Sequence, residues 1–391
     1  MRGSPSAGLV GARSRASTAR CWSAPCGAPA DGRGCGVERS RDLPLIDVLV
    51  LQRAACERAG SALYARILDA MVDDVHADGP CAEILRPWAD NAMADAIPLR
   101  FLAAVHALVL TGEAPALAAH YASAGGADSG DPMPAFLATV EAHRTRIEAA
   151  MDLGVQTNEV GRATSLFGGF HAVARRTGLP LRQLEVGASA GLLLHWDRYG
   201  YRAGGGALAW GPGDGLVFED PWTADLPPVA ADLVVAERRG CDQAPIDPTT
   251  DEGATRLRSF LWPDQVERRA RLDAAIEVAR RHRVVVDAMD AADWIEAQLA
   301  EPTPGLATVV HHSIVLQYLL RSSFVRLRAA IEEAGARATP DAPIHWLRME
   351  PAGDVADVRM SSWPGRGSGH DEELLATTGY HGPPVTWLGG A

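Results

Sequence analysis

The segment LEVGASAGL, residues 184–192, decides the fold of this 391-residue chain. It has the pattern of a buried strand that ends in a turn of small residues, followed by a helix that we place at residues 190–199. Small residues in such a turn let a ligand approach the backbone, and the first turn of the helix offers free N–H groups. The segment therefore predicts a ligand-binding turn at the end of the first strand of an α/β sheet.

Two enzyme chemistries use a turn of this kind, and residues 184–192 fit both patterns. An acidic residue before a Gly-x-Gly-x-Gly-like turn is typical of class I S-adenosylmethionine (SAM) methyltransferases. Glu185, Gly187 and Gly191 fit that pattern, with Ser189 in place of the central glycine. The same residues spell Gly-x-Ser-x-Gly, the nucleophile elbow of α/β-hydrolases, with Ser189 as nucleophile. A tight packing turn without any ligand is the third interpretation.

The residues before this turn favour a helical lobe and argue against the hydrolase. Residues 45–180 are rich in Ala and Leu. Apolar residues recur there three and four positions apart, as in Leu63, Ile67, Leu68 and Met71, which is typical of amphipathic helices. An α/β-hydrolase needs several strands ahead of its elbow. We expect instead an all-helical N-terminal lobe, with the sheet beginning after it.

Beyond the lobe, short apolar runs alternate with helical segments, which is typical of βαβ units and a parallel sheet. The predicted strands are Leu181–Val186, Leu233–Ala236, Val284–Val286, Ala307–Val310 and Ile344–Met349. The predicted helices are Asp264–His282, Ala291–Ala300 and Ser322–Ala334. The closing antiparallel strands are expected at Val355–Ser362, Glu373–Thr377 and Val385–Leu388. The glycine-rich residues 200–232 are expected to form an inserted loop or hairpin.

A cofactor turn at one strand end predicts further ligand-binding groups at the ends of neighbouring strands. The run Leu233–Glu237 ends in an acid, and a carboxylate there can accept both ribose hydroxyls of a nucleoside. A solvated surface acid is the alternative for Glu237. Asp290 is expected to face the adenine, with Asp287 in reserve, although Asp290 can also cap the helix that follows it.

Two histidines, His311 and His312, directly follow the strand predicted at residues 307–310. Adjacent residues point to opposite sides of a strand and no third ligand is evident, so no metal is expected. At a strand exit, His312 is the candidate general base or substrate contact, and a purely structural histidine is the alternative.

Composition and charge exclude several function classes. The net charge is −12, and seven arginines and three acids in residues 1–42 leave −16 on residues 43–391. Such an acidic body is a poor candidate for nucleic-acid binding, which needs cationic groups. The sequence contains no lysine, which excludes Schiff-base chemistry and P-loop nucleotide hydrolysis.

The distribution of cysteines and apolar residues predicts a cytoplasmic protein. The six cysteines are scattered without a C-x-x-C motif, and no apolar run approaches the ~20 residues of a membrane span. Residues 1–44 lack both periodicity and the apolar centre of a signal peptide, and are expected to be a disordered extension.

Several motifs resemble the bacterial domain-of-unknown-function family 2332, over residues 48–388. They are Gln156–Arg162, Leu184–Leu192, Asp197–Tyr199, Glu237–Asp247, Trp262–Gln265 and His312–Ser313. The resemblance implies a methyltransferase-like sheet with a helical N-terminal lobe. Within it, the polar segment 156–162 either covers the pocket or forms a hydrogen-bond cluster between the two parts.

We therefore predict an α/β fold with a Rossmann-like sheet of the class I methyltransferase type over residues 181–391. In the sequence this sheet is preceded by a helical lobe over residues 45–180. The predicted function is SAM-dependent methyl transfer to a small molecule, in which the protein mainly orients the reactants. The cofactor-binding residues expected are Glu185, Gly187, Ser189, Gly191, Glu237 and Asp290, and the candidate base is His312. The alternatives are a serine hydrolase that uses Ser189 and a Rossmann-like binding module without chemistry.

Overall fold

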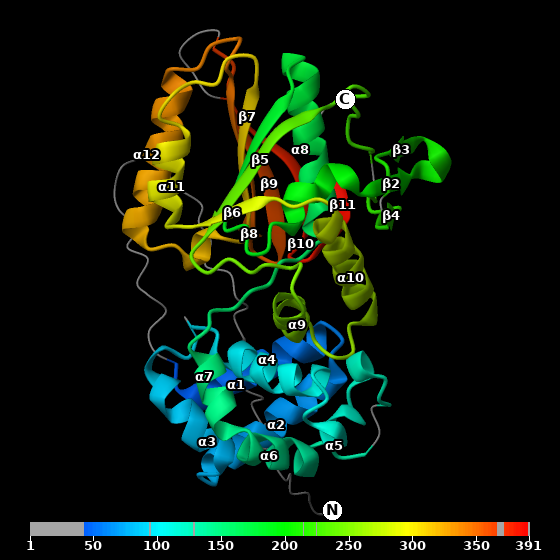
Figure 1. Ribbon diagram of the computed structural model, residues 1–391, viewed down its shortest axis with the longest axis vertical. Helices are drawn as coiled ribbons and strands as arrows, with labels where there is room; N and C mark the ends of the chain where they lie inside the picture. Colours follow the sequence, from blue (N-terminus) through cyan, green and yellow to red (C-terminus); the bar gives the residue numbers. More distant parts are fainter. Residues whose placement is uncertain are drawn as a thin grey trace, which may run out of the picture.

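The computed structural model describes residues 43–389, apart from residues 94, 128–129, 214, 224 and 366–370. The extension expected at residues 1–44 therefore lies almost wholly outside the described residues. The chain has a mixed α/β architecture, in which a helical lobe sits below a large sheet (Figure 1).

The lobe consists of short helices around one apolar core. Its helices are α1 Leu45–Arg58, α2 Ala62–His76, α3 Pro80–Leu85, α4 Ile97–Leu110, α5 Pro115–Ala118, α6 Met133–Ala142 and α7 Arg144–Met151, with 3-10 turns at Arg86–Asn91 and Ala122–Ala124. The stripe Leu63, Ile67, Leu68 and Met71 is buried on α2, as its spacing predicts. Burial of this face stabilises the lobe because apolar surface leaves water.

The sheet has eight strands in the order β11-β10-β9-β8-β7-β1-β5-β6. Strands β6, β5, β1, β7 and β8 are parallel, and β8 to β11 form an antiparallel meander. Their bounds are β1 Leu181–Val186, β5 Val235–Asp242, β6 Val285–Ala288, β7 Ala307–Ser313, β8 Ile344–Ala352, β9 Val355–Trp363, β10 Asp371–Gly379 and β11 Gly382–Trp387. The prediction of a mostly parallel sheet closed by antiparallel strands is confirmed.

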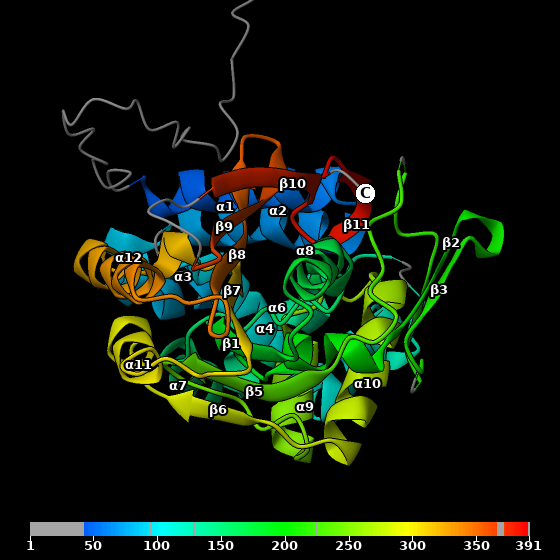
Figure 2. The ribbon, with the colours of Figure 1, turned by 90° about the horizontal axis from the view of Figure 1, so that it is seen from above.

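Helices cover both faces of the sheet, as Figure 2 shows from above. Helices α11 Ala291–Gln298 and α12 Arg321–Ala336 share a core with one face. Helices α8 Arg162–Thr177 and α10 Val266–Arg281 share the larger core on the other face. Residues 200–232 form a small second sheet, in the order β3 Leu208–Trp210, β2 Gly200–Ala203 and β4 Val217–Glu219. The inserted hairpin predicted there is thus part of a three-stranded sheet.

Helix α8 belongs to the sheet and not to the lobe in which the sequence places it. It packs against β7, β8, β10 and β11, and its apolar residues lie in the core of the sheet. A Cβ atom at Gly168 would lie 2.2 Å from the Trp387 ring, and one at Gly169 would lie 2.5 Å from Leu347. The two glycines therefore allow α8 to approach the sheet closely, and packing ends the lobe near Met151.

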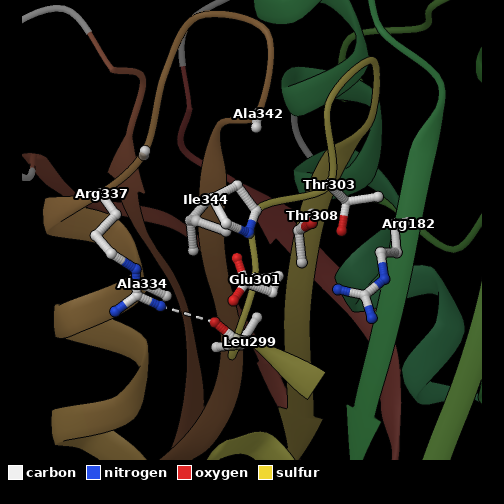
Figure 3. A pocket seen from close by; sticks show the side chains of 11 residues that line it. Arg182, Leu299, Glu301, Thr303, Thr308, Ala334, Arg337, Ala342 and Ile344 are labelled. Atoms are coloured by element: carbon white, nitrogen blue, oxygen red, sulfur yellow. Dashed lines mark hydrogen bonds between the residues drawn. The ribbon is translucent and has the colours of Figure 1, made fainter. Parts of the chain in front are cut away.

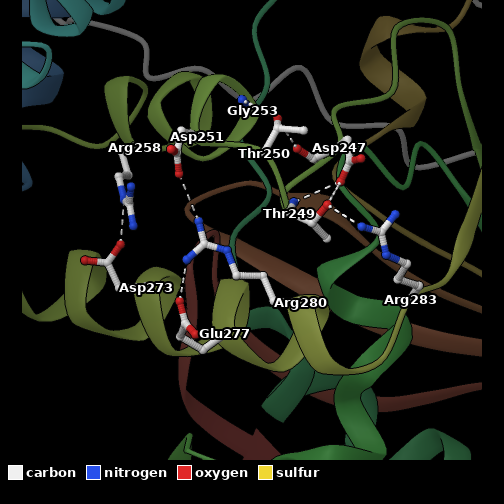
Figure 4. A network of polar contacts seen from close by, with 10 residues as sticks. All are labelled: Asp247, Thr249, Thr250, Asp251, Gly253, Arg258, Asp273, Glu277, Arg280 and Arg283. Atoms are coloured by element: carbon white, nitrogen blue, oxygen red, sulfur yellow. Dashed lines mark hydrogen bonds and ion pairs between the residues drawn. The ribbon is translucent and has the colours of Figure 1, made fainter.

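Helix α9, Asp251–Ser259, joins the two parts of the molecule. It contacts α4 of the lobe, and His106 on α4 lies 3.1 Å (Nδ1) from the Ser259 carbonyl oxygen. Figure 4 shows the network of polar contacts that ties α9 to α10: Arg258 donates to Asp273 at 2.7 Å, and Arg280 contacts both Asp251 and Glu277. This network holds α9 between the sheet and the lobe.

Candidate functional site

The glycine turn follows β1, as predicted, and needs left-handed backbone at three positions. The φ angles are +69° at Gly187, +54° at Ser189 and +71° at Gly191. A Cβ atom at Gly187 would lie 2.6 Å from a Val315 methyl group, so a larger residue does not fit there. The segment after the turn is a 3-10 helix, Leu192–Arg198, and not the α-helix predicted over residues 190–199.

The Glu185 carboxyl group lies at the carboxyl end of β1 and is buried without compensation. Its side chain is 1% exposed, and Oε2 has no hydrogen-bond partner among the described residues. Burial raises the pKa of Glu185 well above its ordinary value, and the nearby Asp242 carboxylate raises it further; Arg162 opposes the shift. Uncompensated burial of a titratable group is typical of functional sites, because a purely structural carboxyl would normally be paired.

Glu237 does not lie where the sequence prediction placed it. The strand that contains it runs from Val235 to Asp242, so Glu237 is near its amino end, opposite Arg182 of β1. It forms an ion pair with Arg182, with 3.2 Å between Nε and Oε2. The predicted ribose contact at Glu237 is therefore wrong, since Gly187 follows the other end of β1.

Asp242 is the acid at the carboxyl end of β5. Its Oδ2 accepts a hydrogen bond of 3.0 Å from the backbone N–H of Ser189, inside the glycine turn. Its Oδ1 accepts from the backbone N–H of Ala244 at 2.9 Å. Sequence reasoning ended this strand too early because Arg238 and Arg239 interrupt the apolar run. In the structure these arginines lie within the strand because their guanidinium groups are paired with Asp197 and Asp287.

Asp290 caps a helix, which is the second of the two roles that its position allowed. Its Oδ1 accepts from the backbone N–H groups of Ala292 at 2.8 Å and Asp293 at 3.4 Å, and its Oδ2 accepts from the Ser323 hydroxyl. The alternative acid, Asp287, accepts from Arg239 and from the Trp294 indole. Both carboxylates are engaged in these contacts, and the predicted adenine contact stays a prediction.

His312 lies on the other face of the sheet from Glu185. Its Nδ1 is 2.7 Å from Oε1 of Glu350, which also accepts from the N–H of Val315 at 3.0 Å. Its ring packs against Trp346, whose core contains α11 and α12 residues, whereas Glu185 lies near Arg162 on the α8 face. The structure therefore does not bring His312 together with Glu185, and the His312–Glu350 pair instead orders the loop after β7.

The segment that joins α7 to α8 contacts the glycine turn through hydrogen bonds of its polar side chains. The hydrogen-bond cluster that one interpretation of residues 156–162 expected is present, whereas the cover over a pocket stays a prediction. The Ser189 hydroxyl donates to Oε1 of Gln156, and Nε2 of Gln156 donates to the Ala244 carbonyl oxygen at 3.2 Å. Oδ1 of Asn158 accepts from the backbone N–H of Leu192 at 3.0 Å. These contacts link two segments more than thirty residues apart.

Arg256 on α9 is a further charged group near Asp242 at the carboxyl end of β5, and the sequence did not predict it. Its Nε and Nη2 atoms are buried and have no hydrogen-bond partner among the described residues. Burial lowers its pKa, while Asp242 and Glu252 act in the opposite direction. The side chain therefore lies within electrostatic range of Asp242. No motif in the sequence distinguishes Arg256 from the many other arginines of the chain.

The part of the chain that the structure describes has two small hollows. Figure 3 shows one at the amino ends of the strands, where Arg182, Thr308 and Ile344 begin β1, β7 and β8. The other lies between residues 157–160 and helices α9 and α10, and it contains the Glu159–Arg268 ion pair. The described residues contain no group of three or more His, Cys, Asp or Glu side chains placed to hold a metal ion. No helix in the same residues is long and apolar enough to cross a membrane.

Comparison with known proteins gives a family and no function. The model of a bacterial family described as "Uncharacterized protein conserved in bacteria (DUF2332)" matches residues 47–387. No curated protein and no solved structure matches the chain.

Proposed function

Because the chain belongs to this uncharacterised bacterial family, we propose its function from the geometry at the carboxyl ends of β1 and β5. The function is SAM-dependent methyl transfer to a small molecule, on a sheet of the class I methyltransferase type. Glu185 carries the proposal, because its carboxyl group is buried beside Asp242 and Oε2 has no partner among the described residues.

The topology of the sheet supports a ligand site at this edge. From β1 the chain continues outward to β5 and β6, and then returns to β7 on the opposite side of β1. Open α/β sheets bind ligands outside the carboxyl ends of the strands at such a switch point. Gly187 follows β1 and Val315 follows β7, so the glycine turn lies at the switch point.

The side chains at the switch point fit the polar parts of SAM. Glu185 would hold the cationic amino group of the methionine part, because a positive charge supplies the partner that its carboxylate lacks. Asp242 would accept the ribose hydroxyls, since it ends the neighbouring strand. Gly187 and Gly191 keep the turn free of side chains. When bound, SAM supplies an electrophilic methyl group. The contribution of this chain is to orient the two reactants and to exclude water.

The serine hydrolase is the less well supported alternative. The described residues contain no strand before β1. Within the same residues no histidine contacts the Ser189 hydroxyl, because this hydroxyl donates to Gln156. A nucleophile elbow needs its serine next to a general base. The binding module without chemistry would use the same edge and differs only in the absence of turnover.

Asp242 and Glu237 give a matched pair of variants for the cofactor assignment. We expect Asp242→Asn to weaken SAM binding by about tenfold or more, because a charge-assisted hydrogen bond is worth about 1.5–3 kcal/mol. Glu237→Gln removes the same charge at the amino end of the same strand and should leave the affinity unchanged. Calorimetric titration with SAM and with S-adenosylhomocysteine checks this. Equal affinities for the two variants would refute the assignment of Asp242.

Ser189→Gly separates the cofactor turn from the hydrolase. Glycine adopts a φ of +54° without steric cost, so we expect SAM binding to persist and the melting temperature to change little, with the lost contact to Gln156 offsetting the relief of backbone strain. A fluorophosphonate probe should not label the wild-type protein. Labelling of Ser189, together with loss of a hydrolytic activity in the variant, would establish the alternative.

A further inference from the structure

Residues 155–160, which we call the strap, connect the last helix of the lobe to α8. The strap has no regular secondary structure, yet Gln156, Glu159 and Val160 are buried in it. It lies directly on the glycine turn through the side chains of Gln156 and Asn158. The strap thus occupies the edge of the sheet at which the switch point predicts a ligand.

Two side chains of the strap engage polar groups at the edge where the proposed ligand would bind. Gln156 holds the Ser189 hydroxyl, and its Nε2 lies 3.4 Å from Oδ1 of Asp242, the acid proposed for the ribose. Asn158 holds the backbone N–H of Leu192, the first residue after the turn. The two amide side chains therefore satisfy the polar groups of the site in the same way that a ligand would.

Side-chain contacts hold the strap at both ends. Glu159 is buried and paired with Arg268 on α10, with 2.7 Å between Oε2 and Nε, and it also lies 3.6 Å from Nδ1 of His381. Burial opposes ionisation of Glu159, but Arg268, His381 and Arg162 hold its pKa below the ordinary value. At the other end, Gln156 is held by its contacts with the Ser189 hydroxyl and the Ala244 carbonyl oxygen. Release of the strap from the glycine turn therefore requires that the Gln156 contacts break.

We infer that the strap is an intramolecular occupant of this site, and that Gln156 and Asn158 set the affinity of the site by holding it closed. This inference rests on the proposed function. A ligand with an adenosine part and the strap compete for Asp242 and the turn, so the site binds only after the two amide side chains have been released.

Closure lowers the apparent affinity by the fraction of molecules in the open form. Loss of the Gln156 hydrogen bonds should raise that fraction, because these bonds favour the closed form. We therefore expect Gln156→Ala to bind SAM about tenfold more tightly than the wild-type protein. The direction of the change in SAM affinity distinguishes two roles of Gln156. If Gln156 holds the site closed, the variant binds more tightly, whereas if Gln156 contacts the bound ligand, the variant binds more weakly.

The matched control is Gln298→Ala. The Gln298 side chain also bonds a charged group, Arg182, but at the amino ends of the strands. Its removal should leave SAM affinity unchanged. Tighter binding in Gln156→Ala alone supports the strap. Unchanged or weaker binding in Gln156→Ala, with measurable binding in the wild type, overturns the strap inference and leaves the proposed function standing. Absence of SAM binding in all three proteins overturns the proposed function itself, and with it the inference.

Hydrogen exchange gives a second readout that needs no methyl acceptor. In the wild-type protein without ligand, the amide of Leu192 should be protected by Asn158, and Asn158→Ala should speed its exchange. Addition of SAM to Asn158→Ala should slow that exchange again, because the ligand takes the place of the Asn158 side chain at the Leu192 amide. Bound SAM that leaves the Leu192 amide unprotected in Asn158→Ala would show that ligand and strap do not compete for this group, and would overturn the inference.

Discussion

Glu185→Gln is expected to raise the melting temperature at pH 7 and, in the same protein, to lower SAM affinity. The folded-state pKa of Glu185 lies above its unfolded value, because the side chain is buried and faces Asp242. A carboxyl of this kind binds more protons in the folded state between the two pKa values, so it costs stability as pH rises through that interval. An amide cannot ionise and removes this cost, which we expect to be about 1–3 kcal/mol at neutral pH.

The effect on melting temperature and the effect on SAM affinity depend differently on pH, so the two can be measured separately. The stability gain of the variant should be smaller at pH 5.5 than at pH 7, because at pH 5.5 less of the interval above the unfolded pKa has been crossed. SAM affinity at pH 7 should fall about tenfold or more, because the carboxyl can release its proton when the cationic ligand binds, whereas the amide cannot become negatively charged. Thermal unfolding at the two pH values and calorimetry with SAM measure both effects.

Gln183 is the control for Glu185, two residues upstream on the same strand. Its Nε2 donates to the Leu194 carbonyl oxygen and its Oε1 accepts from the Trp196 indole, each at 2.8 Å. Gln183→Leu should therefore lower the melting temperature without a specific effect on SAM affinity. If Glu185→Gln is destabilising at pH 7 as well, the carboxyl has a structural partner and the cofactor assignment loses its main support.

Mild acid is expected to unfold the protein through its buried histidines. Burial lowers the pKa values of four of them to about 3, and these are His171, His195, His311 and His345. Below the unfolded pKa of about 6.5 the unfolded chain binds protons that the folded protein cannot, so stability falls as pH falls towards 3. Between pH 7 and pH 5 the loss amounts to about 2 kcal/mol per histidine, comparable in total with the stability of an ordinary domain.

Urea unfolding at pH 7, 6 and 5 tests this prediction. The free energy of unfolding should decrease steeply over that range, and His195→Leu should remove about a quarter of the decrease, because neither ring nitrogen of His195 has a hydrogen-bond partner among the described residues. A free energy of unfolding that is constant from pH 7 to pH 5 would show that these histidines are accessible to protons in the folded state.

The sequence by itself determined the features that depend on neighbouring residues. The helical stripe on α2, the alternation of strands and helices after residue 181 and the antiparallel closure all follow from periodicity within short segments. The glycine turn could be located for the same reason, because its small residues and Glu185 lie within seven positions of one another. The double role allowed for Asp290 was also local, and the structure shows the helix cap.

Tertiary structure decided which side chains meet. Asp242 could not be identified as the acid at the strand end, because the length of β5 depends on ion pairs that Arg238 and Arg239 form with residues far along the chain. His312 was assigned to the site from its position on a strand, but the alternation of side chains across the sheet turns it away from Glu185. The contact between Gln156 and Ser189 spans 33 residues and depends on how α8 packs. The sequence gives the chemistry of each side chain directly. Strand register, strand length and the face of the sheet on which a side chain lies depend on pairing and packing between distant segments. The same long-range packing places the strap on the glycine turn.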